Sequence, residues 1–295
     1  MSIRVCIDGE VLAPEAARVS VFDRGFLYGD SVFETIRTYG GRPFALAEHL
    51  ARLERSAGRV YIDLPVPTSQ LAREIDAALA AAANPESYIR LIVTRGSGPL
   101  GLDTGFEAKP LRAIIVAPLV PPAPELYDEG IAVVTYRTQR VAEATDAAGT
   151  KVGNYLVAVL AMRRAREAGA SEALIVDHSG AVVEGATSNV FLVRDGVLST
   201  PPESAGILPG VTRAKLLDVA ADLGVRVEER PLPVAEVLGA DEVFVSSSIR
   251  ELLPVVRVDG QPIGACRPGP VSRRLLQAFR EKASKLMCLS AEAGP

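Results

Sequence analysis

The sequence is poor in the residues that most metal and hydrolytic sites require. It contains only two histidines, His49 and His178, which argues against His-ligated metals and against Ser-His-Asp hydrolysis. Its three cysteines, Cys6, Cys266 and Cys288, are far apart and odd in number, so we expect neither a disulfide framework nor a CxxC zinc motif. We therefore expect no metal site, and acid–base chemistry by Lys, Tyr or carboxylates. The two histidines are expected on a helix surface and in a turn.

Long apolar runs and clustered positive charge are also missing. No uninterrupted apolar run reaches membrane-spanning length, and the first residues, MSIRVCIDGE, have no apolar signal core. The net charge is -4, and no basic stripe is present, which argues against nucleic acid as a partner. These features favour a cytoplasmic protein without membrane contact. Small anionic ligands stay open, because they need only a few local cations or helix amides.

What the chain does have is enough apolar sequence for two cores. Its 295 residues are 48% hydrophobic, and this length favours two domains, with one large domain as the alternative. The proline-rich stretch APLVPPAPELYD should prevent helix and interrupt strand pairing. We place an N-terminal α/β domain at 1–119, an interdomain linker at 120–127 and a C-terminal domain at 128–295. Strands and helices mixed with hairpins predict the α+β class.

Local patterns predict several elements along the chain. The segment 88–95, YIRLIVTR, alternates, which predicts a strand with Ile89, Leu91 and Val93 in a core. Helices are expected at 44–57, at 69–83 after a Thr68 cap, and at 155–169. Residues 23–39 are expected as helix or loop, 141–154 as a polar loop, and hairpins around 177–180 and 195–196.

Three weak signals point to an anion site. Pro209-Gly210 directly precedes a predicted helix, whose first amides would belong to Val211 and Thr212. The predicted strand EVFVSSS ends in three serines, 246–248. Arg52 is offset from the apolar stripe of its predicted helix, so exposure to solvent is its default position. Together these groups would form a phosphate cradle if the fold brings them together.

Three further residues could carry or support chemistry. Lys151 lies in the small-residue stretch AAGTKVGNYL, and a desolvated lysine there would be a nucleophile able to form a Schiff base. Arg90 shares the polar face of its predicted strand with Tyr88, which suits a cavity that accepts a carboxylate. Glu184 interrupts two apolar runs in VVEGATSNVFLV. Taken alone, a turn at the surface is the safer interpretation of that carboxylate.

An ordered set of motifs carries a resemblance to a known family. DRGFLYGDSVFETIR, EHLARL, YIRLIVTRG, KVGNY, EGATSNVF, LPGVTR and SSSIRE resemble, in this order and at comparable spacing, the class IV, fold-type IV pyridoxal-phosphate enzymes. This resemblance extends from about residue 20 to residue 260. It implies a smaller N-terminal α/β domain, a larger C-terminal mixed β-barrel-like domain with helices, the cofactor pyridoxal 5'-phosphate and a homodimer.

The resemblance also implies a role for each matching residue. Lys151 matches the lysine that forms the Schiff base and moves the substrate proton, and Glu184 matches the carboxylate beside the pyridine nitrogen. The implied cofactor-binding residues are Arg52, Lys151, Tyr155, Glu184, Ser188, Asn189, Val211, Thr212, Ser247 and Ser248. The implied substrate-binding residues are Phe33, Arg37, Tyr88, Arg90 and Ile249.

The motifs do not agree on one branch of the family. Phe33, Arg37, Tyr88, Arg90 and Tyr155 are similar to branched-chain members, which favours ping-pong transfer of an amino group from L-branched-chain amino acids to 2-oxoglutarate. KVGNY is one residue shorter than the usual branched-chain motif, and ETIR, EGATSNVF and SSSIRE look closer to other branches. The alternatives are a D-amino-acid or (R)-amine transaminase, an aminodeoxychorismate lyase, and a non-catalytic protein that binds the cofactor.

Overall fold

The computed structural model describes residues 2–138 and 147–292, and side-chain surroundings through residue 285. The start of the predicted polar loop, 141–146, therefore lies outside the described residues. The chain divides into two compact units. The smaller unit contains the described residues up to Val120, the segment Thr150–Asn154 and the described residues from Met287. The larger unit contains the described residues between Pro121 and Gly149, and Tyr155–Leu286.

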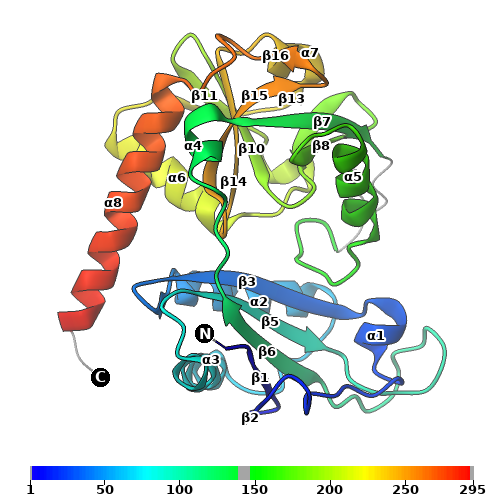
Figure 1. Cartoon of the computed structure of the whole chain (residues 1–295). Helices are drawn as coiled ribbons and strands as arrows, with labels where there is room; N and C mark the ends of the chain where they lie inside the picture. The colour runs from blue at the N-terminus through cyan, green and yellow to red at the C-terminus, as the bar shows by residue number, and fades with distance from the viewer. Residues whose placement is uncertain (1, 139–146, 293–295) are drawn as a thin grey trace. The chain divides into compact units, whose positions relative to one another are not determined.

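The smaller unit is an antiparallel sheet with helices (Figure 1). Its strand order is β2-β1-β6-β5-β3-β4. The strands are β1 (Arg4–Ile7), β2 (Glu10–Leu12), β3 (Ser31–Tyr39), β4 (Arg42–Pro43), β5 (Ser87–Thr94) and β6 (Leu111–Pro118). The helices are α1 (Arg24–Tyr28), α2 (Leu46–Arg59) and α3 (Thr68–Ala82).

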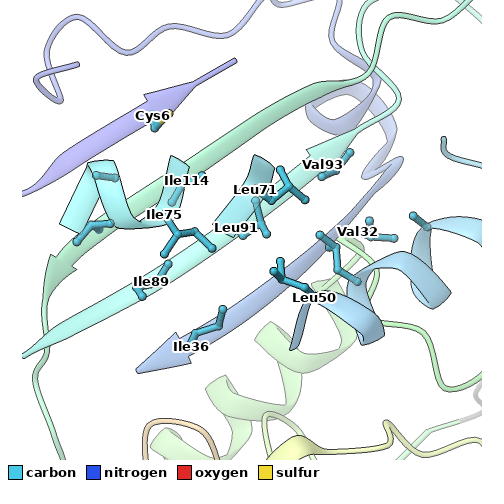
Figure 2. Close-up of a cluster of buried hydrophobic side chains, with 14 of the residues drawn as sticks. Cys6, Val32, Ile36, Leu50, Leu71, Ile75, Ile89, Leu91, Val93 and Ile114 are labelled. Atoms are coloured by element: carbon cyan, nitrogen blue, oxygen red, sulfur yellow. The ribbon is translucent and has the colours of Figure 1, made fainter. Parts of the chain in front are cut away.

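The core of the smaller unit lies between its sheet and helices α2 and α3. Ile89, Leu91 and Val93 are fully buried on one face of β5, which confirms the predicted alternation. Figure 2 shows them against Leu50 of α2 and Leu71 of α3, which belong to the same buried cluster. This packing fixes β3 and α2 together, and both elements carry predicted site residues.

Two predictions for the smaller unit are wrong in detail. Most of the stretch expected as helix or loop is strand β3, because Gly29 ends α1 in the left-handed conformation and the β-branched residues after it pair with β5. Val32 and Ile36 of β3 are fully buried. Helix α3 begins one residue earlier than expected, because Thr68 is its first helical residue and Pro67 is the N-cap.

The larger unit is built on one long mixed sheet, with strand order β12-β11-β10-β14-β15-β7-β8-β9-β13 and β16 paired with β15. Its strands are β7 (Ile131–Arg137), β8 (Glu172–Val176), β9 (Ala181–Gly185), β10 (Asn189–Arg194), β11 (Val197–Thr200), β12 (Val227–Glu229), β13 (Leu232–Pro233), β14 (Glu242–Ser247), β15 (Glu251–Val258) and β16 (Gln261–Pro262). Its helices are α4 (Glu125–Glu129), α5 (Leu156–Glu167), α6 (Val211–Asp222), α7 (Val234–Leu238) and α8 (Pro270–Glu292).

Several sequence expectations hold in the larger unit. Strands β8 and β9 form the predicted hairpin, and β10 and β11 form the second one around Asp195 and Gly196, both with positive φ. Gly169 follows the C-cap of α5 with φ 68°, as expected for a helix stop. The combination of mixed sheets and helices confirms the α+β class. The expected helix-free stretch is shorter than predicted, because α4 begins directly after Pro124.

Within the described residues, no helix combines the length and the apolar character needed to cross a membrane.

Candidate active site

Lys151 is held by strand β3 of the smaller unit. The Phe33 amide donates to the Lys151 carbonyl at 3.0 Å, and the Gly153 amide donates to the Ser31 carbonyl at 2.7 Å. A Cβ atom at Gly153 would lie 2.1 Å from Ser31 Oγ, so only glycine allows this close approach. The backbone around Lys151 is thereby fixed although it belongs to no regular element.

The aromatic ring of Phe33 lies beside two cations. Lys151 Nζ is 4.5 Å from the ring centroid, and the Arg90 guanidinium carbon is 3.9 Å from it. Arg90 reaches this place from β5, where it is opposite Thr35 of β3. The structure therefore gathers three of the predicted residues around one buried ring, and the attraction of cations to the ring face stabilises the group.

The other predicted substrate residues of the smaller unit lie on the same pair of strands. Arg37 of β3 is opposite Tyr88 of β5. Its guanidinium carbon lies 4.3 Å from the centre of the Tyr39 ring. Tyr88 is half-buried, in keeping with the intermediate polarity of its strand face.

Arg52 is buried, which corrects the expectation that it faces solvent. Only 4% of it is exposed. Its Nε donates to Glu34 Oε1 at 2.8 Å and its Nη2 to Glu34 Oε2 at 2.6 Å. This bidentate pair orients the guanidinium plane. The apolar stripe of α2 predicted a solvent position only because the sequence does not show that a carboxylate of β3 faces the helix.

His49 is also buried, whereas the sequence suggested a helix surface. Its Nδ1 lies 2.7 Å from Glu34 Oε2, and 1% of the residue is exposed. Burial lowers the pKa of His49, the positive charges of Arg52 and Lys151 lower it further, and Glu34 opposes them. The imidazole is therefore neutral at pH 7 and donates its Nδ1 proton to Glu34. His178, by contrast, lies in the turn after β8, as expected.

Glu34 is the acceptor that holds this group together. Burial alone would raise the pKa of its carboxyl, but the hydrogen bonds and charges of Arg52 and His49 lower the pKa to about 2. The carboxylate is therefore ionised and fully enclosed. The sequence analysis did not single out Glu34. A usable signal was present, since His49, Arg52 and Ser56 recur at spacings of three and four residues on one side of α2.

Glu184 and Asn189 of the larger unit both hold the turn before α6. The Leu208 amide donates to Glu184 Oε2 at 3.0 Å, and Asn189 Nδ2 donates to the Leu208 carbonyl at 2.9 Å. Glu184 is half-buried near the end of β9, so the interpretation of a plain surface turn is wrong. Gly210 packs closely on this pair, because a Cβ there would lie 2.0 Å from Asn189 Oδ1.

Helix α6 begins where the sequence predicts it. Its first residues are Val211 and Thr212, both buried, and Gly210 is the N-cap. The first amides of a helix carry partial positive charge and suit an anion. Asn189 and Glu184 thus lie next to the start of α6 through their shared contact with Leu208.

The remaining predicted residues lie at turns of the larger unit. Ser188 is in the turn between β9 and β10, where its Oγ lies 2.1 Å from the position of a Cβ at Gly185. Ser247 ends β14, and Ser248 and Ile249 follow in the turn to β15. Strands β10 and β14 are paired, with Asn189 opposite Ser246. Tyr155 is the N-cap of α5.

Each unit therefore holds one half of a set of reactive and binding groups. The smaller unit supplies an amine that can act as a nucleophile or a base, with a guanidinium beside the same ring. The larger unit supplies a carboxylate, an anion-binding helix start and a serine-rich turn. An amine, a carboxylate and an anion site are the groups that a phosphorylated carbonyl cofactor requires.

Comparison with known proteins agrees with this set. Residues 31–258 match the family described as amino-transferase class IV. A Methanocaldococcus jannaschii protein, provisionally named a branched-chain-amino-acid aminotransferase, is 38% identical over 96% of this chain and 97% of its own length. The D-alanine aminotransferase of Bacillus licheniformis is 33% identical over 94% of this chain and 96% of its own.

Solved structures give the same result. The branched-chain amino acid aminotransferase of Escherichia coli superimposes with a TM-score of 0.91 at 33% identity, covering 95% of this chain and 94% of that one. A second branched-chain amino acid aminotransferase, solved with pyridoxamine 5'-phosphate, gives a TM-score of 0.89 at 31% identity, covering 95% and 93% of the two chains. The fold is that of the fold-type IV enzymes, and the chain belongs to the class IV aminotransferases, which act on amino acids and 2-oxo acids with pyridoxal 5'-phosphate.

Proposed function

We propose that the protein transfers the amino group of L-branched-chain amino acids to 2-oxoglutarate by a ping-pong mechanism, with Lys151 as the residue that attaches the cofactor. The observation that carries this proposal is the shared contact of Lys151 and Arg90 with the Phe33 ring. Arg90 would receive the second carboxylate of glutamate or 2-oxoglutarate. The apolar ring beside it would contact an aliphatic side chain.

The residues present fit the cofactor. The start of α6 suits the phosphate, and Gly185 and Gly210 allow backbone approaches that a Cβ would block. Glu184 would face the pyridine nitrogen, with its carboxylate oriented by the Leu208 amide. When bound, the cofactor supplies an electron sink that stabilises negative charge at the substrate Cα.

The chain's own residues then have separate tasks in this proposal. The Lys151 amine moves the proton to and from the substrate Cα, and the β3 contacts hold its backbone in place. Arg52 binds phosphate through a guanidinium oriented by Glu34. Tyr155, Ser188, Asn189, Ser247 and Ser248 complete the cofactor contacts, and Phe33, Arg37, Tyr88, Arg90 and Ile249 the substrate contacts.

The proposal includes a homodimer. Helix α5 exposes Leu156, Val157, Val159 and Leu160, while its buried residues are the small Ala161 and Ala165. In Figure 1 this helix lies beside β7 and β8, which it contacts. An exposed apolar helix face of this kind is typical of a protein–protein interface. A second copy of the chain would cover it.

A D-amino-acid transaminase is the second candidate, because a D-alanine aminotransferase is among the relatives that span nearly the whole chain. Half-reactions with L-leucine, D-alanine and (R)-1-phenylethylamine separate the candidates. Each donor is mixed with the holoenzyme, and the loss of the visible cofactor absorbance is followed by stopped flow. We expect L-leucine to react fastest. A markedly faster reaction with D-alanine would contradict the proposed substrate.

The role of Arg90 has its own test within the same assay. Arg90→Ala should impair the reaction with 2-oxoglutarate by at least tenfold more than the half-reaction with L-leucine, because L-leucine has no second carboxylate. Arg112→Ala is a control on the neighbouring strand β6, where the arginine pairs with Glu74 instead. Equal losses for both substrates would assign Arg90 to structure or to the α-carboxylate.

A further inference from the structure

Glu172 is a fully buried carboxylate of the larger unit that the proposed chemistry does not use. It is the first residue of β8, and none of it is exposed. Its Oε2 accepts from Thr187 Oγ1 at 2.9 Å and from Ser188 Oγ at 3.4 Å, and it forms a close ion pair with Arg250 Nη1. One carboxylate oxygen thus collects three side-chain donors.

The three donors come from two different turns. Thr187 and Ser188 belong to the turn between β9 and β10, directly after Glu184, whereas Arg250 belongs to the turn between β14 and β15, directly after Ser248. Arg250 Nη1 also donates to Thr187 Oγ1 at 2.9 Å. The two turns that carry proposed cofactor ligands are therefore joined through a single buried group.

The second turn is also fixed from its other side. The Arg250 amide donates to Ser247 Oγ at 3.3 Å, and Tyr127 Oη donates to the Arg250 carbonyl at 3.2 Å. The next residue, Glu251, has φ 58°, a conformation that non-glycine residues adopt only where their surroundings enforce it. Its carboxylate pairs with Arg280 Nη2 at 2.6 Å. The backbone of this turn is over-determined.

A buried ion pair is a poor way to stabilise a fold. Apolar residues of similar volume stabilise at least as well, because they carry no desolvation penalty. What a charged and hydrogen-bonded group adds is a fixed geometry between the parts it joins. Arg250 is partly exposed, with 23% of its side chain accessible, so its guanidinium could have faced solvent, but it turns to Glu172 instead.

We propose that Glu172 and Arg250 are positioning residues, whose ion pair sets the spacing of the Thr187–Ser188 turn and the Ser248–Arg250 turn around the cofactor. The inference rests on the proposed function, because that function assigns Ser188, Ser247 and Ser248 to the cofactor. The pair acts on the rate at which cofactor is lost and on turnover. It does not contact the substrate, since Arg250 Nη1 is used by Glu172 and Thr187.

The test compares the rate of cofactor loss from holoenzyme variants. Glu172→Gln keeps the shape of the buried side chain but removes its charge, and Arg250→Met removes the partner at a less buried place. Each holoenzyme is mixed with a scavenger of free pyridoxal phosphate, and the decay of the visible cofactor absorbance is recorded. We expect both variants to lose cofactor at least tenfold faster than the wild type. Arg250→Lys should recover part of this loss.

Two comparisons separate positioning from general weakening. Glu236→Gln disrupts another ion pair of the same unit, with Arg230, and should leave the rate unchanged. The double variant Glu172→Gln/Arg250→Met should lose cofactor no faster than the faster single variant, because both changes break one interaction. If Glu172→Gln does not fold, Arg250→Met and Arg250→Lys still decide the question.

The contradictory results are distinct. Cofactor loss from Arg250→Met at the wild-type rate would overturn the inference. So would a selective rise in KM for 2-oxoglutarate at an unchanged rate of loss, since Arg250 would then bind substrate directly. If the wild-type protein itself binds no pyridoxal phosphate, the proposed function fails before the ion pair is tested.

Discussion

Helix α2 and helix α5 are of similar length, yet they distribute polar and apolar side chains in opposite ways. Helix α2 buries His49, Arg52 and Ser56 beside its apolar stripe. Helix α5 exposes four large apolar side chains and buries alanines. The usual helix of a globular protein does the reverse in both cases. The two departures have different causes, and each points to a function.

In α2 the buried polar side meets a charge of the same unit. Glu34 neutralises Arg52 and accepts from His49, so the polar stripe is satisfied inside the unit. In α5 the apolar side is exposed in a single copy of the chain. The first departure prepares groups near Lys151, whose amide donates to Ser56 Oγ at 3.3 Å. The second is explained if another copy of the chain packs on the helix.

The largest expected effect concerns the charge inside α2. Arg52→Ala leaves Glu34 buried without its main counter-charge, and we expect a loss of about 3–5 kcal/mol in the free energy of unfolding. Urea unfolding at pH 7 measures this loss. Arg55→Ala is the control, because Arg55 is on the exposed side of the same helix, where substitutions change stability by about 0.5 kcal/mol or less.

A loss below about 1 kcal/mol in Arg52→Ala would show that water or another group compensates Glu34, and α2 would then be an ordinary amphipathic helix. Cofactor binding should weaken in the same variant.

The next effect is the pH dependence of stability. The pKa of Glu34 in the fold is about 2, below its ordinary value of 4.5, and the pKa of His49 is also lowered, from 6.5. The unfolded chain therefore binds more protons as the solution becomes acidic. The stabilisation by His49 is complete above pH 6.5 and declines below it. That by Glu34 is complete above pH 4.5 and is lost as the pH falls toward 2.

Urea unfolding between pH 7.5 and pH 4 measures this decline. His49→Gln should flatten the part of the curve between pH 6.5 and pH 5, because the amide does not titrate. A wild-type stability that stays constant over that range would contradict a neutral, buried imidazole.

The smallest effect on the fold concerns α5. Val159→Asp places a charge on the exposed apolar face, where the isolated chain tolerates it with about 0.5 kcal/mol or less. We expect the mass measured by sedimentation equilibrium to fall from that of a dimer to that of a monomer. Arg163→Ser, on an exposed position of the same helix, should remain dimeric. A monomeric wild type, or a Val159→Asp variant that stays dimeric, would remove α5 from the interface.

The two helices also show how far sequence reasoning reaches. Patterns of short range are sufficient for Ile89, Leu91 and Val93 in β5, for the hairpin turn at Asp195, and for the start of α6 at Val211. These features depend on neighbours in the chain and on solvent. The apolar stripe of α2 was likewise visible.

The burial of His49 and Arg52 could not be predicted in the same way. It depends on Glu34, which precedes them on a separate strand, and only the packing of β3 against α2 brings the three together. The ion pair of Glu172 and Arg250 joins residues even farther apart. The ordered motifs located the Lys151 and Glu184 segments, but the partners that hold such residues come from the tertiary fold.

One measurement tests the central claim most directly. Borohydride reduction of the holoenzyme fixes bound cofactor on the lysine to which it is attached, and mass spectrometry of the digest identifies that residue. The account predicts a phosphopyridoxyl group on the peptide that contains Lys151. Labelling of Lys109 or Lys215 instead, or no labelled peptide, would contradict it.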